Sequence, residues 1–395
     1  MAVLAVAAHS ARMLAEAAAR DGFEVVALDL FGDTDTRRAA SSCVLIGVAP
    51  SLRIDPPRVL AALREVARRS DVIGWVAGSG FEGQPGLIEQ GARLLPLIGT
   101  PADAVRRVRD PAQFFAFLAA QRIGHPHTQL TPPADHAGWL LKDALGCGAW
   151  HIRRAGATAG AAPARRDACD ARDAGDAGDY YQREVEGTPM SATFIANGTR
   201  AALLGINELI VQPLAGRPFV YFGAVGPVPV AEDVARQVAA AVQWVAAEFA
   251  LRGLCSLDFM LDGAQINVLE VNPRPPASMA SYAALPLMRW HVRACLEGEL
   301  PATCELEVAR AATPDAHRVR GHRIVFARQP LELTELAVRT FDGALDVHDL
   351  PICGACFGPG DPLCSVSAAA ADAAQVRALL DTRARQWLST LETSQ

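Results

Sequence analysis

The chain has 395 residues, of which 51% are hydrophobic, so it is long enough for more than one domain with a sizeable core. Its formal net charge of −6 argues against a protein that attracts nucleic acid electrostatically, and no run of 18 apolar residues indicates a membrane span. The nine cysteines, an odd number scattered along the chain, suit a reducing cytoplasm better than a disulfide framework.

The first hundred residues alternate between apolar segments and helical patterns. Strands are expected at residues 3–8, 23–30, 44–48 and 72–77, with a helix at 11–20. Such alternation is typical of a parallel α/β sheet, in which functional loops follow the carboxyl ends of the strands. Three loops fit this expectation, at residues 9–12, 29–36 and 77–83.

The next part of the chain contains a segment of unusual composition. Residues 101–123 are expected to be helical, and Pro126 opens an extended segment that leads to a strand at 139–141. Residues 153–179 consist mainly of Ala, Gly, Asp and Arg, with almost no large apolar side chain, so they cannot bury enough surface to offset the entropy of ordering. We expect a mobile loop there, either a spacer between strands or a functional lid.

Regular structure is expected again from residue 180 onward. The expected elements are a strand, turn and strand at 180–198, an irregular segment at 220–230, an amphipathic helix at 231–251 and a β-hairpin at 254–273. Asp262 and Gly263 are expected to form the hairpin turn. From about residue 306 we expect a small β-rich part with a last helix at 371–391.

Lys142 is the single lysine of the chain, although the sequence holds 37 basic Lys and Arg residues. A surface cation would tolerate either residue type, whereas a site that needs a compact ammonium would not tolerate a flat guanidinium. A turn with Gly146 and Gly148 follows the strand that carries this lysine. Glycine turns allow the backbone to approach a phosphate, so we expect a phosphate site here.

The hairpin at 254–273 carries a second group of polar residues. Asp258 is expected to end one strand, and Glu270 and Asn272 lie two apart on the partner strand, so both point to the same face. Two carboxylates and an amide oxygen suit Mg²⁺; the alternative is three polar residues at a hairpin mouth without a ligand. Arg274 follows between prolines and could bind a carboxylate or an acyl-phosphate through two hydrogen bonds.

These motifs resemble those of the ATP-grasp superfamily. Lys142 with its glycine turn, then "YYQREVEG", "LDF" and "LEVNPRP", occur in the order and spacing of that superfamily over roughly residues 101–300. The sequence is most similar to the biotin-carboxylase-related branch of predicted ATP-dependent carboligases, whose signatures "DLFxDxDT" and "SGFE" stand at residues 29–36 and 79–82.

The resemblance implies an α/β protein of three parts. It implies an N-terminal Rossmann-like pre-ATP-grasp domain over residues 1–100 and an ATP-grasp domain of two α+β lobes over 101–305, which includes the low-complexity loop. A β-rich C-terminal domain with a terminal helix would then occupy residues 306–395.

The resemblance also implies roles for individual residues. Lys142 would contact the α- and β-phosphates of ATP, and Arg274 would face the carboxylate being activated, so both count as catalytic candidates. The phosphate-covering loop and the hinge beside adenine would include Gly146, Gly148, Gln182, Arg183 and Val185. The Mg²⁺ ligands would be Asp258, Glu270 and Asn272. A second nucleotide-contacting lysine common in the superfamily is absent, and Arg106, Arg107 or Arg109 could replace it.

The implied reaction is phosphorylation of a carboxylate by ATP, followed by displacement of phosphate by an amine, with ADP as product. The acid would be glutamate or a similar acid in one-carbon cofactor synthesis of the tetrahydromethanopterin or methanofuran type. The alternatives are a carboxylase that uses bicarbonate and a nucleotide-binding protein without turnover. The expected partners are a small-molecule carboxylate and amine, with a homodimer left open and no nucleic acid or membrane.

Several further residues are candidates for contacts with the second substrate or a metal. Glu82 and the neighbouring Ser79 follow a predicted strand end, which places them where an amine could bind. Three acidic residues lie close together in the sequence, namely Asp29, Asp33 and Asp35. They could bind a cationic part of a substrate or a second metal, or they could form a solvated turn. His9, Ser10 and Arg12 are weaker candidates. A zinc site is a weak alternative, because its candidate ligands fit no strong zinc spacing; they are Cys353, Cys356, Cys364 and His348.

Overall fold

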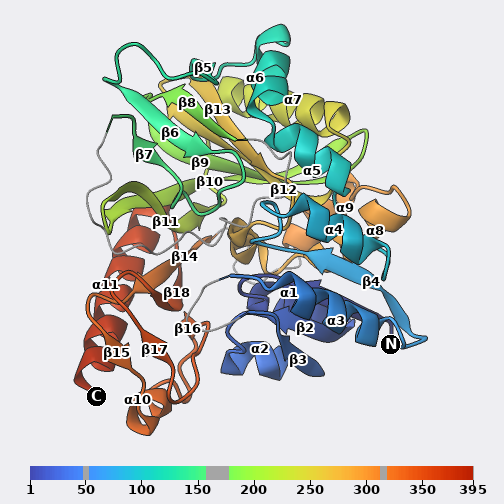
Figure 1. Ribbon diagram of the computed structural model, residues 1–395, viewed down its shortest axis with the longest axis vertical. Helices are drawn as coiled ribbons and strands as arrows, with labels where there is room; N and C mark the ends of the chain where they lie inside the picture. The colour runs from blue at the N-terminus through green and yellow to red at the C-terminus, as the bar shows by residue number, and fades with distance from the viewer. Residues whose placement is uncertain (48–52, 157–177, 312–317, 395) are drawn as a thin grey trace.

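A computed structural model describes residues 1–47, 53–156, 178–311 and 318–394 of the chain. Its sheets and flanking helices form the expected mixed α/β fold (Figure 1). No helix among these residues combines the length and the apolar character that crossing a membrane requires.

The N-terminal part contains a parallel four-stranded sheet in the order β3-β2-β1-β4. The strands are β1 (Val3–Ala7), β2 (Glu24–Asp29), β3 (Ser42–Leu45) and β4 (Val72–Ala77). The helices of this part are α1 (Arg12–Arg20), α2 (Thr34–Ala39), α3 (Pro56–Val66) and α4 (Pro85–Ala92). The strands predicted at 3–8, 23–30 and 72–77 are therefore confirmed, whereas β3 begins two residues earlier than the strand predicted at 44–48 and overlaps it only at 44–45.

Strand β1 is apolar throughout because both of its faces are covered. Val3 and Ala5 pack into one hydrophobic cluster, whereas Leu4 and Val6 pack into another on the opposite side of the sheet. Successive side chains of a strand alternate between faces, so a strand buried on both sides needs an unbroken apolar run. The loop at its carboxyl end is thereby held in a fixed position.

Two short helices connect the N-terminal part to the next sheet. They are α5 (Ala102–Arg109) and α6 (Pro111–Ala120), as expected for residues 101–123. The side chain of Asp110 caps α6 by accepting hydrogen bonds from the backbone amides of Ala112 and Gln113, and Pro111 occupies the first turn. Proline is favoured there because its missing amide would have no helical partner.

A small four-stranded sheet in the order β5-β8-β6-β7 follows. Its strands are β5 (Thr128–Gln129), β6 (Trp139–Asp143), β7 (Arg153–Arg154) and β8 (Asp179–Arg183). The predicted strand, turn and strand at 180–198 is present, but its two strands belong to different sheets. Residues 157–177, most of the expected mobile loop, lie outside the described residues.

The largest sheet has eight strands in the order β13-β12-β9-β10-β11-β14-β18-β16, all paired antiparallel. The strands are β9 (Thr188–Asn197), β10 (Ala201–Leu214), β11 (Arg217–Gly226), β12 (Arg252–Asp262), β13 (Gln265–Asn272), β14 (Val319–Phe326), β16 (Val347–His348) and β18 (Pro362–Ala370). The C-terminal strands extend the same sheet, because β14 pairs with β11.

Other helices and short strands surround this sheet. They are α7 (Glu232–Glu248), the 3₁₀ helix η1 (Ala277–Tyr282), α8 (Leu287–Leu296), α9 (Thr303–Ala311), β15 (Leu331–Glu332), α10 (Glu335–Arg339), β17 (Cys356–Phe357) and α11 (Ala373–Thr393). The helices expected at 231–251 and 371–391 are confirmed as α7 and α11.

The prediction that residues 220–230 are irregular is wrong for their first half. Strand β11 continues through Gly226 and pairs with β10 on one side and β14 on the other. Its glycines permit close approach: a Cβ added at Gly223 would lie 2.0 Å from the carbonyl oxygen of His322. Glycine in a strand can therefore mark close backbone contact as well as a break.

The hairpin of β12 and β13 is confirmed, with Gly263 in its turn. The expectation that Asp258 ends a strand is wrong, because β12 runs on to Asp262. A register shift follows Asp258, where the strand faces Glu270 on β13. This irregularity keeps the two carboxylates opposite each other within a continuous pair of strands.

Candidate nucleotide and metal site

Lys142 lies on β6 with a buried side chain that is 3% exposed. Its Nζ donates a hydrogen bond of 3.1 Å to Oε1 of Gln182 on β8 and lies 5.8 Å from the centre of the Tyr180 ring. It forms no ion pair with any residue that the structure describes. A buried ammonium without a carboxylate partner is costly, so this position suits an anionic ligand.

The glycine turn after β6 is shaped by its contacts with a histidine and with β11. A Cβ added at Gly146 would lie 2.1 Å from the ring of His151, so glycine lets the ring pack against the loop. Gly148 has a φ of 62°, and its carbonyl accepts a hydrogen bond from the amide of Tyr221. The loop is thus folded against the large sheet beside Lys142.

His151 is a site candidate that sequence reasoning missed. Its side chain is buried, and neither ring nitrogen has a hydrogen-bond partner among the described residues. Burial lowers its pKa to about 4, with Lys142 and Arg109 adding to the shift. An unsatisfied buried imidazole beside a glycine turn indicates a place for a polar ligand. The available signal was its position directly after "GCGAW".

Of the three candidate arginines at the end of α5, only Arg109 reaches this site. Its guanidinium donates to the carbonyl of Gly146 at 2.6 Å and forms an ion pair of 3.3 Å with Glu270. Arg106 and Arg107 instead contact residues of α4 and α7. Arg109 therefore ties the glycine turn to the hairpin.

The three predicted metal ligands lie together on the hairpin. Asp258 and Glu270 are direct partners across β12 and β13, and Nδ2 of Asn272 donates to Oδ2 of Asp258 at 3.0 Å. Ser191 on β9 also donates to Asp258, at 2.7 Å. The two carboxylates and the amide therefore lie close together on the hairpin, and binding of Mg²⁺ by their oxygens stays a prediction.

The electrostatics of this group also fit a cation. Burial raises the pKa of Asp258 to about 6, and repulsion from Glu270 adds to the shift. Burial works to raise the pKa of Glu270 too, but Arg109 and Lys142 outweigh it and hold that pKa below its usual value. Two opposed, half-buried carboxylates would be stabilised by a cation between them.

Arg274 and Glu82, singled out on separate grounds, form an ion pair across 192 positions of the chain, with Glu82 buried and Arg274 largely so. The guanidinium donates to Oε1 of Glu82 at 2.8 and 2.9 Å and to Oδ1 of Asn272 at 3.2 Å. The other oxygen of Glu82 accepts from the amide of Gly80, and Ser79 lies half-buried in the same loop. The arginine thus adjoins the candidate metal ligands, and its present carboxylate partner is Glu82.

The three hinge candidates have different environments. Gln182 is buried and also donates to Thr128, whereas the side chain of Arg183 is exposed and lies over the Trp139 ring. Val185 is half-buried in the connection between β8 and β9. Only Gln182 is joined to Lys142 by a side-chain contact, and adenine contacts of all three stay predictions.

The acidic residues after β2 do not form a solvated turn. Asp29 is fully buried, and its carboxylate accepts hydrogen bonds from the backbone amides of Ala11, Phe31 and Gly32. It therefore holds the loops after β1 and β2 in place. Asp33 and Asp35 lie at the start of α2, toward the C-terminal strands.

The weak zinc alternative receives no support from the described residues. Cys364 is buried on β18, whereas Cys353 and Cys356 are exposed, and none of them belongs to a described group of metal-type ligands. Among these candidates only His348 does, in company with two carboxylates.

The sequence matches the ATP-grasp domain family over residues 109–278. L-amino acid ligase from Bacillus licheniformis has a similar structure, with a TM-score of 0.67 at 14% identity over 97% of this chain and 96% of that chain. The biotin carboxylase domain dimer of 2-oxoglutarate carboxylase from Hydrogenobacter thermophilus, solved with MgADP, ADP and bicarbonate, has a TM-score of 0.68 at 13% identity over 98% and 89%.

A third similar structure is N5-carboxyaminoimidazole synthetase from Staphylococcus aureus, complexed with ADP, with a TM-score of 0.65 at 13% identity over 97% of both chains. The comparison with curated protein sequences finds no match. Identities this low establish a common fold and nothing more specific. Residues 109–278 thus match the ATP-grasp domain family, and the fold of the chain is similar to the folds of these three enzymes.

Proposed function

We propose that the protein is an ATP-dependent ligase that activates a carboxylate as an acyl-phosphate and joins it to an amine, releasing ADP. The observation that carries the proposal is the arrangement around Lys142, a buried ammonium without an ion pair. It adjoins a glycine turn, a histidine without partners and a pair of opposed carboxylates. These groups match what phosphoryl transfer requires, which is positioning and neutralisation of charge.

Lys142 and His151 would bind phosphate oxygens of ATP from beneath the glycine turn. Both are buried; among the described residues Lys142 has no charged partner, and neither ring nitrogen of His151 has a hydrogen bond. A bound phosphate would supply those contacts and raise the pKa of His151 from its lowered value. Arg109 would position the turn through its bond to the Gly146 carbonyl.

Asp258, Glu270 and Asn272 would hold Mg²⁺. When bound, the ion would neutralise the charge of the terminal phosphates. Ser191 and Arg109 would hold the two carboxylates in place, since each already bonds to one of them.

Arg274 would orient the acceptor carboxylate beside the metal ligands. Its guanidinium can form two parallel hydrogen bonds with a carboxylate, and it now makes two with Glu82. The substrate carboxylate would share or replace that partner. Burial works to raise the pKa of Glu82, but Arg274 holds it below its usual value, so Glu82 stays ionised and can attract the incoming ammonium.

Product analysis tests the proposal. The purified chain is supplied with Mg-ATP, glutamate as the first acid and a panel of primary amines, including amino acids and aromatic amines. ADP and phosphate should form at an appreciable rate only when an acid and an amine are both present. In Arg274→Gln, addition of the acid and the amine should no longer increase ADP formation. Formation of AMP and pyrophosphate would contradict the acyl-phosphate route.

Carboxylation with bicarbonate is a second candidate function. It is favoured by the similarity to a biotin carboxylase domain solved with bicarbonate and MgADP, and Arg274 could hold bicarbonate as it would another carboxylate. ADP release that depends on bicarbonate, without any added amino acid, would favour this reaction over the ligase.

A further inference from the structure

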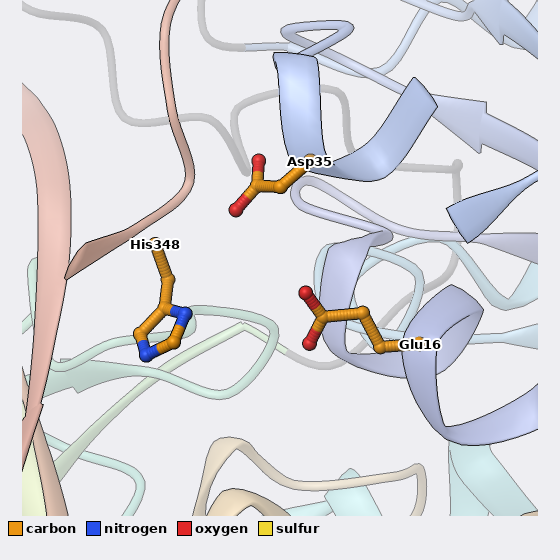
Figure 2. A group of neighbouring side chains, drawn as sticks. All are labelled: Glu16, Asp35 and His348. Atoms are coloured by element: carbon orange, nitrogen blue, oxygen red, sulfur yellow. The ribbon is translucent and has the colours of Figure 1, made fainter. Parts of the chain in front are cut away.

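A second group of ligand-type side chains lies where the N-terminal part meets the C-terminal strands. It consists of Glu16 on α1, Asp35 on α2 and His348 on β16. One oxygen of each carboxylate and one ring nitrogen all lie within 4.8 Å of one another. Figure 2 shows the three side chains converging from three separate segments, and they form the one such group among the described residues.

The ring of His348 is oriented so that one nitrogen faces the two carboxylates while the other is hydrogen-bonded. Its Nε2 forms a hydrogen bond of 2.8 Å with Oγ of Ser367 on the neighbouring strand β18. The other ring nitrogen, Nδ1, is turned toward the carboxylates of Glu16 and Asp35 (Figure 2). A histidine that binds a metal commonly uses its second nitrogen in this way, which fixes the ring and its tautomer.

The two carboxylates are positioned by outer contacts. Asp35 accepts hydrogen bonds from the backbone amides of Asp349 and Leu350, at 2.8 and 3.0 Å. Arg12 contacts Glu16 at 3.0 Å and Asp35 at 3.6 Å, and it also pairs with Asp349 at 2.9 Å. Ligating carboxylates are usually hydrogen-bonded in turn, so these contacts are compatible with metal binding. Arg12 is therefore shared by three carboxylates, so its single positive charge does not neutralise all of them.

Asp33 adds a further carboxyl group that could contact a cationic ligand. Its side chain is 6% exposed, and it forms no hydrogen bond or ion pair with any described residue. It lies near enough to Asp35 and Asp349 for their charges to repel it. A buried carboxyl group without a partner is either protonated or, when it is ionised, needs a cation close by.

His322 adds a second unsatisfied group on the same face of the sheet. In the register of β14 and β18 it is opposite Ser367, and Ser365, two residues away, is opposite His348 on β16. Residues opposite each other or two apart share a face, so both histidines project from one face. Nδ1 of His322 is buried without a described partner, and its Nε2 bonds to Tyr221.

We propose that Glu16, Asp35 and His348 bind one divalent transition-metal ion, with Asp33 and His322 beside it. Mg²⁺ and Ca²⁺ prefer oxygen ligands alone, whereas a mixed set of carboxylates and imidazole suits Mn²⁺, Fe²⁺ or Zn²⁺. The site is separate from the hairpin ligands of the proposed function. The ion would join α1, α2 and β16, and so would fasten the N-terminal part to the C-terminal strands.

Titration of the intact chain with Mn²⁺, without nucleotide, tests the site. Electron paramagnetic resonance counts the free ion, and Mn²⁺ avoids the soft thiolates of the nine cysteines. His348→Gln and Glu16→Gln should each weaken one saturable site by roughly tenfold or more. His136→Gln, which removes an exposed imidazole, should leave that site unchanged.

Two further measurements separate this site from the others. Asp258→Asn, which alters the proposed nucleotide metal site, should leave the Mn²⁺ ion at His348 in place. Mn²⁺ should raise the melting temperature of the parent more than that of His348→Gln, because the ion binds only the folded chain and the variant lacks one ligand of this site. Equal Mn²⁺ binding by the parent and His348→Gln would overturn the proposal. It would also fail if methylammonium, rather than Mn²⁺, raised the melting temperature.

Discussion

At the scale of single residues, the character of the candidate site depends on Lys142. Its ammonium is buried, with a neutral amide and an aromatic ring as its described contacts. The hydrogen bond to Gln182 orients the ammonium group of Lys142 but does not neutralise its charge. A compact ammonium can turn its three donors toward several phosphate oxygens, whereas a guanidinium at the same position would need more room and a planar partner.

Lys142→Arg should therefore lower nucleotide affinity by roughly tenfold or more, although the charge is kept. Isothermal titration with Mg-ATP measures the affinity, and thermal unfolding checks that the fold is retained. Lys142→Met, which keeps the length of the side chain but removes the charge, should lose affinity as well. Unchanged ATP binding by Lys142→Arg would show that the single lysine has no role in phosphate binding.

At the scale of elements, glycines decide how closely strands approach. Gly223→Ala would place a Cβ 2.0 Å from the carbonyl of His322, so the pairing of β11 with β14 must distort. The free energy of unfolding should fall by about 1–3 kcal/mol, measured by urea denaturation. Gly99→Ala is the matched control, because an added Cβ there meets no atom within 4 Å. Equal stability of the two variants would contradict this account of β11.

The same glycines explain why some elements could be predicted from the sequence and others could not. Strand β1 was predictable because burial on both faces demands an apolar run, and the hairpin because Gly263 marks its turn. Strand β11 was mistaken for irregular chain because its glycines also occur in turns. What makes them compatible with a strand is the approach of β14, about a hundred residues later in the chain, which local sequence does not express.

Helix α8 is fixed to β12 by a histidine that must stay neutral. Nδ1 of His291 accepts a hydrogen bond from the Leu254 amide at 2.8 Å, so Nε2 carries the proton and donates to the Ile98 carbonyl at 2.9 Å. Burial lowers the pKa of His291 from its ordinary 6.5 to about 4. Protonation of Nδ1 would break the bond to Leu254.

Stability should depend on pH in a corresponding way. The contribution of His291 is complete above pH 6.5 and is lost as the pH falls toward 4, by up to about 3 kcal/mol. Urea denaturation between pH 7.5 and 4.5 should show a shallower pH dependence for His291→Gln than for the parent. His136→Gln, an exposed control, should retain the parent's slope. Identical slopes for the parent and His291→Gln would contradict a neutral buried His291.

At the scale of the whole molecule, the candidate site is assembled from parts that are far apart in the chain. Arg274 and Glu82 were each predictable from their local sequence, Arg274 from its flanking prolines and Glu82 from the end of a strand. Their ion pair was not predictable, because it depends on how the N-terminal sheet docks onto the hairpin. The two residues therefore join the N-terminal part directly to the proposed carboxylate site.

Glu82→Gln would leave the guanidinium of Arg274 buried without a carboxylate. Breaking such a pair by removing one partner costs about 3–5 kcal/mol, so this variant should melt at a lower temperature than the parent. If Arg274 is the carboxylate site, free glutamate should supply the missing partner and raise the melting temperature of Glu82→Gln more than that of the parent.

Asp349→Asn is the matched control for this rescue, because it breaks the ion pair between Arg12 and Asp349. Like the pair of Arg274 and Glu82, this ion pair joins the N-terminal part to a distant segment of the chain. Glutamate should not restore that variant, since Arg12 lies outside the proposed substrate site. Differential scanning fluorimetry over a series of glutamate concentrations measures both responses. Glutamine, which has an uncharged side chain, serves as the comparison ligand. Equal shifts in the two variants would mean that glutamate acts as a general stabiliser, and Arg274 would lose its assignment as the residue that holds the acceptor carboxylate.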